Sequence, residues 1–179
     1  MKNKFLTYLM ACIISFLPLV CSAALYQNEI GNASFSIEMP IMHADDKAVA
    51  TKVVSQVPGR KDIYVAFGNP QYPLNIYRLI VADAKNTQEV TPKEVKYFLS
   101  LLKRNGMPVK VVSQKETTIQ GFKAVYINAT QTSAKQSFNH NIYIVAYGNH
   151  VVYFSSQNDE KTTPSKEELD KFAKSFVLK

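Results

Sequence analysis

The chain has little cysteine, and both of its cysteines, Cys12 and Cys21, lie in the N-terminal part of its 179 residues. A catalytic thiol, a thiolate metal ligand or a disulfide would have to come from that part of the chain. If it is removed, the rest of the protein has none of the three. Small exported domains often use disulfides because their cores are limited, so packing alone must stabilise this one.

Histidine and glycine are also scarce, with three and six residues. A hairpin turning at Gly148-Asn149 would put His140 and His150 on opposite faces, about seven residue pairs or roughly 23 Å apart at ~3.3 Å per residue. With His43 as the third histidine, we expect no metal site. The sequence has no P-loop, no dinucleotide-binding glycine turn and no G-x-S-x-G elbow. We therefore expect no cofactor, no catalytic residues and no enzymatic activity.

The N-terminus has the pattern of a cleavable secretory signal peptide. Lys2 and Lys4 precede an apolar run over residues 5–20, and small residues follow at 21–24. The sequence predicts cleavage after Ala23, with Ala24 as the alternative position. A permanent membrane helix needs about 20 apolar residues, and this run is shorter and contains a proline. A lipid anchor on Cys21 would normally follow a small residue, whereas Val20 is large.

Residues 24–179 are then expected to form a single globular domain in the bacterial periplasm or outside the cell. The full chain carries 21 basic and 14 acidic residues, and two of the basic ones leave with the leader. The remaining basic excess would allow contact with an anionic membrane surface. The charges are scattered, however, which is typical of an ordinary solvated surface. We expect a protein partner and no nucleic acid, and either a monomer or an oligomer fits the sequence.

Alternating apolar residues bounded by turn residues indicate many strands. The segment Phe35–Met39 alternates and stops at a proline, and Pro58-Gly59 is a turn pair between two apolar runs. Residues 68–73, which contain two prolines, are expected to form a rigid loop. The expected strands are 35–39, 50–57, 62–68, 74–82, 108–117, 121–131, 139–148 and 150–157.

Two segments instead show helical spacing. Thr91 to Glu94 form a capping box with proline at the first helical position, and Gly106 can end that helix in a left-handed conformation. A second capping box, Ser165 to Glu168, begins a C-terminal helix. The apolar stripes that follow at helical spacing are Val95, Phe98, Leu99 and Leu102, and Leu169, Phe172, Ala173 and Phe176.

The hairpin around Gly148-Asn149 predicts how these elements assemble. If those two residues form the turn, both faces of the hairpin are largely apolar, unlike a sheet with one face in water. The hairpin must then lie centrally, and the two amphipathic helices are available to cover it. The sequence therefore predicts an α+β fold, with an antiparallel sheet of about seven or eight strands between helices.

This arrangement resembles the PsbP-like fold group, which includes bacterial exported proteins of the DcrB type. The resemblance rests on the strand Phe35–Pro40, the helix 91–104, the strand opening Gly121–Ala124, and the last hairpin leading to a helix that ends near Phe176. Bacterial members often carry a tryptophan after the opening proline, and this chain has none. The resemblance implies an α/β/α sandwich and an accessory role without catalysis, and it transfers no functional residue.

We therefore interpret the sequence as an exported, non-catalytic accessory or adaptor module that binds an envelope or extracellular partner through a sheet edge or a loop. A secreted factor acting on a host is compatible with the same features. The alternative class is a secreted hydrolase or small-ligand-binding protein whose site is assembled from distant residues. Asn69, Gln71 and Tyr72 are the candidate binding residues, because prolines pre-order their loop and tyrosine is enriched at interfaces.

Overall fold

The computed structural model describes residues 25–30, 33–38, 49–57, 60–69, 72–103, 106–134, 136–159 and 166–179. The predicted signal peptide, its cleavage site and His43 lie outside these residues. In the described part of the chain, no helix is both long and apolar enough to cross a membrane.

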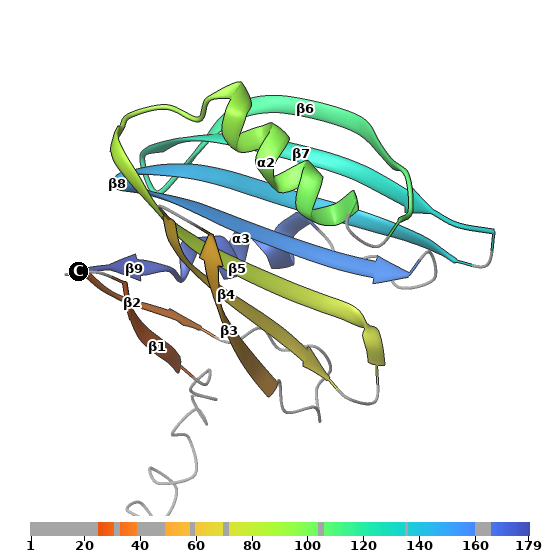
Figure 1. Cartoon of the computed structure of the whole chain (residues 1–179), viewed down its shortest axis with the longest axis horizontal. Helices are drawn as coiled ribbons and strands as arrows, with labels where there is room; N and C mark the ends of the chain where they lie inside the picture. Colours follow the sequence, from red (N-terminus) through yellow and green to blue (C-terminus); the bar gives the residue numbers. More distant parts are fainter. Residues whose placement is uncertain are drawn as a thin grey trace, which may run out of the picture.

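The strands form two antiparallel sheets, of three strands in the order β1-β2-β9 and of six in the order β3-β4-β5-β8-β7-β6. Figure 1 shows α2 lying across one face of the larger sheet, with β6 at that sheet's outer edge. The predicted α+β class with an antiparallel sheet and covering helices is confirmed. The elements are β1 (Leu25–Ile30), β2 (Ala33–Glu38), β3 (Val49–Val57), β4 (Arg60–Asn69), β5 (Tyr72–Thr87), α2 (Pro92–Lys103), β6 (Val109–Ile119), β7 (Phe122–Thr132), β8 (Ser137–Asp159), α3 (Lys166–Lys174) and β9 (Val177–Leu178).

The long element β8 reverses direction at Gly148. Its first part, Ser137–Val145, pairs with β7, whereas Gly148–Gln157 pairs with β5, and Figure 1 shows the ribbon folding back between them. Val145 shares an apolar core with Val152, so odd and even positions exchange faces across the turn. Gly148 has a φ of 64°, which suits the first central position of a type II′ hairpin turn. The predicted hairpin is therefore present at the centre of the sheet.

Helix α2 begins as its sequence predicts. The backbone N–H of Thr91 donates to Glu94 Oε2 at 3.1 Å, and the N–H of Glu94 donates to the Thr91 carbonyl, also at 3.1 Å. Gly106 follows the helix with a φ of 74°, a conformation that glycine adopts without steric cost. These local contacts fix both ends of the helix.

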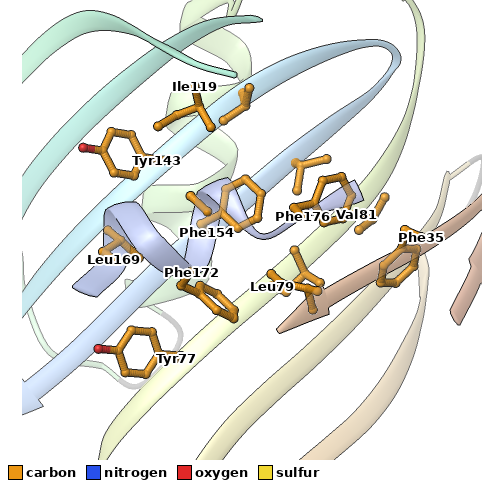
Figure 2. Close-up of a cluster of buried hydrophobic side chains, with 14 of the residues drawn as sticks. Phe35, Tyr77, Leu79, Val81, Ile119, Tyr143, Phe154, Leu169, Phe172 and Phe176 are labelled. Atoms are coloured by element: carbon orange, nitrogen blue, oxygen red, sulfur yellow. The ribbon is translucent and has the colours of Figure 1, made fainter. Parts of the chain in front are cut away.

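A separate apolar core fills the space on each face of the larger sheet. On one face, α3 packs Leu169 and Phe172 against residues such as Leu79 and Phe154, and Figure 2 shows these side chains converging beneath the helix. On the other face, α2 packs Phe98 and Leu102 against the isoleucines and Tyr153 of the central strands. The sheet is therefore the middle layer of a sandwich.

Some boundaries differ from the predictions. Helix α3 ends at Lys174, so Phe176 is not helical, although it is buried in the same core. The chain then forms β9, and Lys179, which follows that strand, exchanges backbone hydrogen bonds with Ser34 of β2 at 2.8 and 3.0 Å. The predictions also missed β1, because a short, polar strand becomes recognisable only when its partner strand is in place.

Candidate functional site

The turn between β4 and β5 carries the binding residues predicted from the sequence. Asn69 ends β4, Tyr72 begins β5, and the two residues pair across the turn. The expected loop over 68–73 is thus wrong at its ends, because strand pairing continues to the residues beside the turn. Gln71, and the side chains of Asn69 and Tyr72, lie outside the described residues. Their role in binding stays a prediction.

The two described histidines lie in different surroundings. His140 is fully buried, with its Nε2 3.2 Å from Gln131 Oε1, and burial together with the positive charge of Arg78 lowers its pKa to about 4. His150 instead lies beside Asp83, with Nε2 3.5 Å from Oδ1. Within the described ranges, no three histidine, cysteine or acidic side chains gather into a possible metal site.

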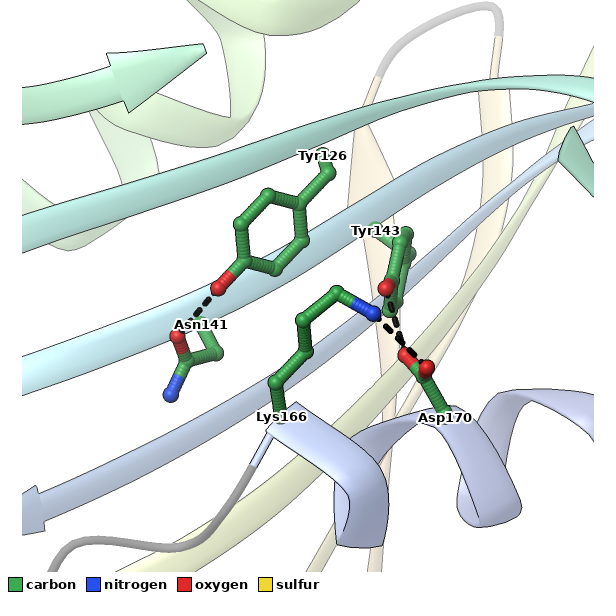
Figure 3. A network of polar contacts seen from close by, with 5 residues as sticks. All are labelled: Tyr126, Asn141, Tyr143, Lys166 and Asp170. Carbon is green, nitrogen blue, oxygen red and sulfur yellow. Dashed lines mark hydrogen bonds and ion pairs between the residues drawn. The ribbon is translucent and has the colours of Figure 1, made fainter. Parts of the chain in front are cut away.

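A polar network joins α3 to the sheet (Figure 3). The Tyr143 hydroxyl donates to Asp170, and Lys166 Nζ lies 2.7 Å from Asp170 Oδ2. Burial and the bond to Asp170 raise the pKa of Tyr143 to about 12. Although burial alone would raise it, hydrogen bonds from Lys166 and Tyr143 keep the pKa of Asp170 below its ordinary value. At neutral pH the tyrosine is therefore protonated and the ion pair is charged, which suits an anchor for α3 better than a proton-transfer site.

The α3 face of the sheet carries a second tyrosine, Tyr126, whose hydroxyl group also forms a hydrogen bond. Tyr126 donates to Asn141 Oδ1 at 2.7 Å, and Asn128 Nδ2 donates to the same oxygen at 3.0 Å. The ammonium groups of Lys115 and Lys166 lie 5.5 and 5.7 Å from the centre of the Tyr126 ring, within the range of cation–π attraction. These contacts hold the Tyr126 side chain in place on the sheet.

A groove of about 630 Å³ separates α2 from β6. Its floor is apolar, made by the half-buried Val90, Val95 and Leu99 and the buried Val125. Its rim is charged, with Lys96 and Lys103 on α2, Glu89 just before the helix and paired with Lys123 at 3.2 Å, and Glu116 on the strand side. An apolar floor with a few polar groups around it, and a volume between ~300 and 1,000 Å³, is typical of binding sites. We take this surface, named here the α2–β6 groove, as the candidate functional site.

One wall of the α2–β6 groove is an edge strand. β6 pairs with β7 on one side, and no strand in the described part of the chain pairs with its other side. A register shift occurs between Val111 and Ser113, and the pairing then continues regularly to Ile119. The outer backbone groups of residues 113–119 can therefore accept a further strand. Sequence reasoning suggested a sheet edge but did not say which one, since strand order depends on pairing between distant segments.

Comparison with known proteins identifies the fold. No protein-family model and no curated protein sequence matches this chain. A solution structure of cyanobacterial PsbP (CyanoP) from Synechocystis sp. PCC 6803 superposes with a TM-score of 0.58 at 12% identity, covering 89% of this chain and 95% of that one. The chain thus has the PsbP-like fold, as the sequence resemblance implied.

A crystal structure from Bacteroides thetaiotaomicron VPI-5482 has the same fold at a TM-score of 0.50 and 12% identity. That alignment covers 81% of this chain and 45% of the other, so this chain spans less than half of that protein. LpqN of Mycobacterium tuberculosis aligns with a TM-score of 0.45 at 11% identity. Likeness at these identities concerns the fold alone, because one fold hosts many functions.

Proposed function

We propose that this protein is an exported, non-catalytic accessory module that holds an extended segment of a protein partner in the α2–β6 groove. The observation that supports it is the combination of an unpaired strand edge with an apolar floor beside it. Backbone pairing to residues 113–119 would supply affinity. The apolar floor and the charged rim would contact alternate side chains of the bound segment and so provide specificity, as in other cases of sheet-edge recognition.

The charges of the groove indicate what such a segment contains. Lys96 and Lys103 are the basic residues on α2, Glu89 just before the helix is paired with Lys123, and Glu116 lies on the strand side. An extended segment with apolar residues toward Val95 and Leu99 and an acidic residue toward the helix would match this distribution. Complementary charge of this kind mainly sets specificity and association rate.

A non-catalytic role is supported by the state of the polar clusters. Tyr143, Lys166 and Asp170 are hydrogen-bonded to one another and hold their ordinary charges at neutral pH. A general acid or base works best with a pKa near the operating pH. Tyr143 and the Lys166–Asp170 ion pair are thus poorly suited to act as the acid or base of a hydrolase.

Charge reversal on the helix side of the groove tests the proposal. The double variant Lys96→Glu, Lys103→Glu should reduce capture of the partner from an envelope extract by about tenfold or more, because an acidic segment would then be repelled. The matched control is Lys93→Glu with Lys171→Glu, which changes net charge equally at exposed positions outside the groove lining. Equal capture by the two double variants would contradict the proposal.

A further inference from the structure

Arg78 lies on the α2 face of the sheet between two neutral hydrogen-bond acceptors. Its Nε donates to the Tyr64 hydroxyl at 3.0 Å, and its Nη2 donates to Gln157 Oε1 at 2.6 Å. Its Nη1 is buried and has no hydrogen-bond partner. The guanidinium is thus fixed in place by two contacts that leave its positive charge uncompensated.

No acidic side chain among the described residues forms an ion pair with Arg78. Lys123 pairs with Glu89, His150 with Asp83 and Lys166 with Asp170, and none of these ion pairs involves Arg78. Arg78 is half-buried, and a charge that is partly withdrawn from water is normally paired. Arg78 therefore has the chemistry of an anion-binding group whose anion is supplied by another molecule.

A cavity of about 140 Å³ adjoins this arginine and is lined by Tyr64, Arg78, Ile80, Phe98, Leu101, Leu102, Gln131 and Gln157. Its polar side consists of the guanidinium, two amides and a phenol. Its apolar side consists of three aliphatic side chains, Ile80 from the sheet and Leu101 and Leu102 from α2, and of the Phe98 ring. The volume is well below the ~300 Å³ at which sites for drug-sized ligands begin, and equals that of roughly five water molecules at ~30 Å³ each.

Other polar atoms near Arg78 also lack partners. Ser155 is the direct cross-strand neighbour of Arg78, and its Oγ is buried without a hydrogen bond. His140 lies on the same face with a buried, unpartnered Nδ1. Three unsatisfied polar atoms on one face are unusual, because buried polar groups are nearly always hydrogen-bonded.

We propose that this cavity, named here the Arg78 niche, binds a small aliphatic carboxylate. The carboxylate pairs with the Arg78 guanidinium, and the short alkyl chain lies against Ile80, Phe98 and Leu101. A planar guanidinium matches a carboxylate well in geometry. The apolar side of the niche favours an alkyl acid over a fully hydrated inorganic anion. This site is independent of the α2–β6 groove.

Titration of residues 24–179 with acetate, propionate and butyrate tests the proposal. Calorimetry and amide chemical shifts should show saturable binding that strengthens from acetate to propionate, with the largest shifts around Arg78, Ser155 and Gln157. Methyl propionate, which has the same chain without the charge, should bind at least about tenfold more weakly. If sulfate and phosphate bind as tightly as propionate, or if no carboxylate saturates, the proposal is wrong.

The variant Gln157→Glu gives the sharpest test, because it places a carboxylate 2.6 Å from Nη2 with almost no change in shape. It should raise the thermal midpoint and weaken propionate binding by at least about tenfold, since the protein now supplies the anion itself. Gln136→Glu, an exposed change of the same kind, should bind propionate like the wild type. Unchanged binding in Gln157→Glu would overturn the assignment, as would an equal loss in the control.

Discussion

The ring of Phe98 in α2 stacks on the ring of Tyr153 in β8, with 5.6 Å between ring centres and 13° between planes. Phe98 is 1% exposed and Tyr153 is fully buried. This pair fixes how α2 lies on the central hairpin. It thereby sets one wall of the α2–β6 groove and one wall of the Arg78 niche.

Phe98→Ala should lower the free energy of unfolding by about 3–5 kcal/mol, the usual cost of truncating a buried aromatic side chain. Phe172→Ala in α3 should cost a similar amount, because its ring contacts those of Phe67, Tyr77 and Phe154. Urea unfolding measures both, with the exposed Lys96→Ala as control. A wild-type midpoint in either variant would mean that its helix does not cover the sheet.

Local signals explain what the sequence predicted correctly. The capping box at Thr91 and Glu94, the glycine turns and the alternating runs each act within a few residues, so α2 and the central hairpin could be placed. The extent of β5 and the position of β1 could not be predicted from the sequence, because they depend on pairing with other strands.

The two candidate surfaces depend even more on tertiary structure. Tyr64, Arg78 and Gln157 come from three strands, and nothing in their local sequences marks them as neighbours. The α2–β6 groove likewise requires knowing that β6 is an edge strand. By contrast, the placement of His140 and His150 on opposite faces of the sheet followed directly from the hairpin register.

His140 should make the protein less stable in acid. The pKa of His140 is about 4 in the folded protein and 6.5 in the unfolded chain. Between these two values the unfolded chain binds a proton at this histidine, whereas the folded protein does not. Stability is therefore lost as the pH falls from about 6.5 to about 4, by roughly 3 kcal/mol in all. Urea unfolding at pH 7 and pH 4.5 should show a smaller loss for His140→Gln than for the wild type. An identical loss in both proteins would refute this assignment.

The mature protein is predicted to begin near Ala24. The basic N-terminal residues, the short apolar run and the small residues at 21–24 predict cleavage there. Intact-mass measurement on protein recovered from the periplasm or the medium should give the mass of residues 24–179, or of 25–179 for the alternative site. A retained N-terminus, or a lipid on Cys21, would show that the chain is tethered instead.

The turn between β4 and β5 remains a predicted contact of its own. Tyr72→Ala should reduce partner capture while leaving the thermal midpoint within about 1 °C of wild type, as expected for an exposed interface residue. Gln71→Ala serves as a milder change in the same turn. If Tyr72→Ala lowers stability and leaves capture unchanged, the tyrosine is structural.

Site-specific photo-crosslinking in living cells tests the binding of a partner segment most directly. A photoreactive residue in place of Ser100 on α2 or Gln114 on β6, the two sides of the groove, should yield one and the same discrete adduct. The same photoreactive residue at Lys171 on α3 should not yield this adduct. The yield of the adduct from Ser100 should fall in the Lys96→Glu, Lys103→Glu double variant. Different adducts from the two sides, or an equally strong adduct from Lys171, would contradict the account.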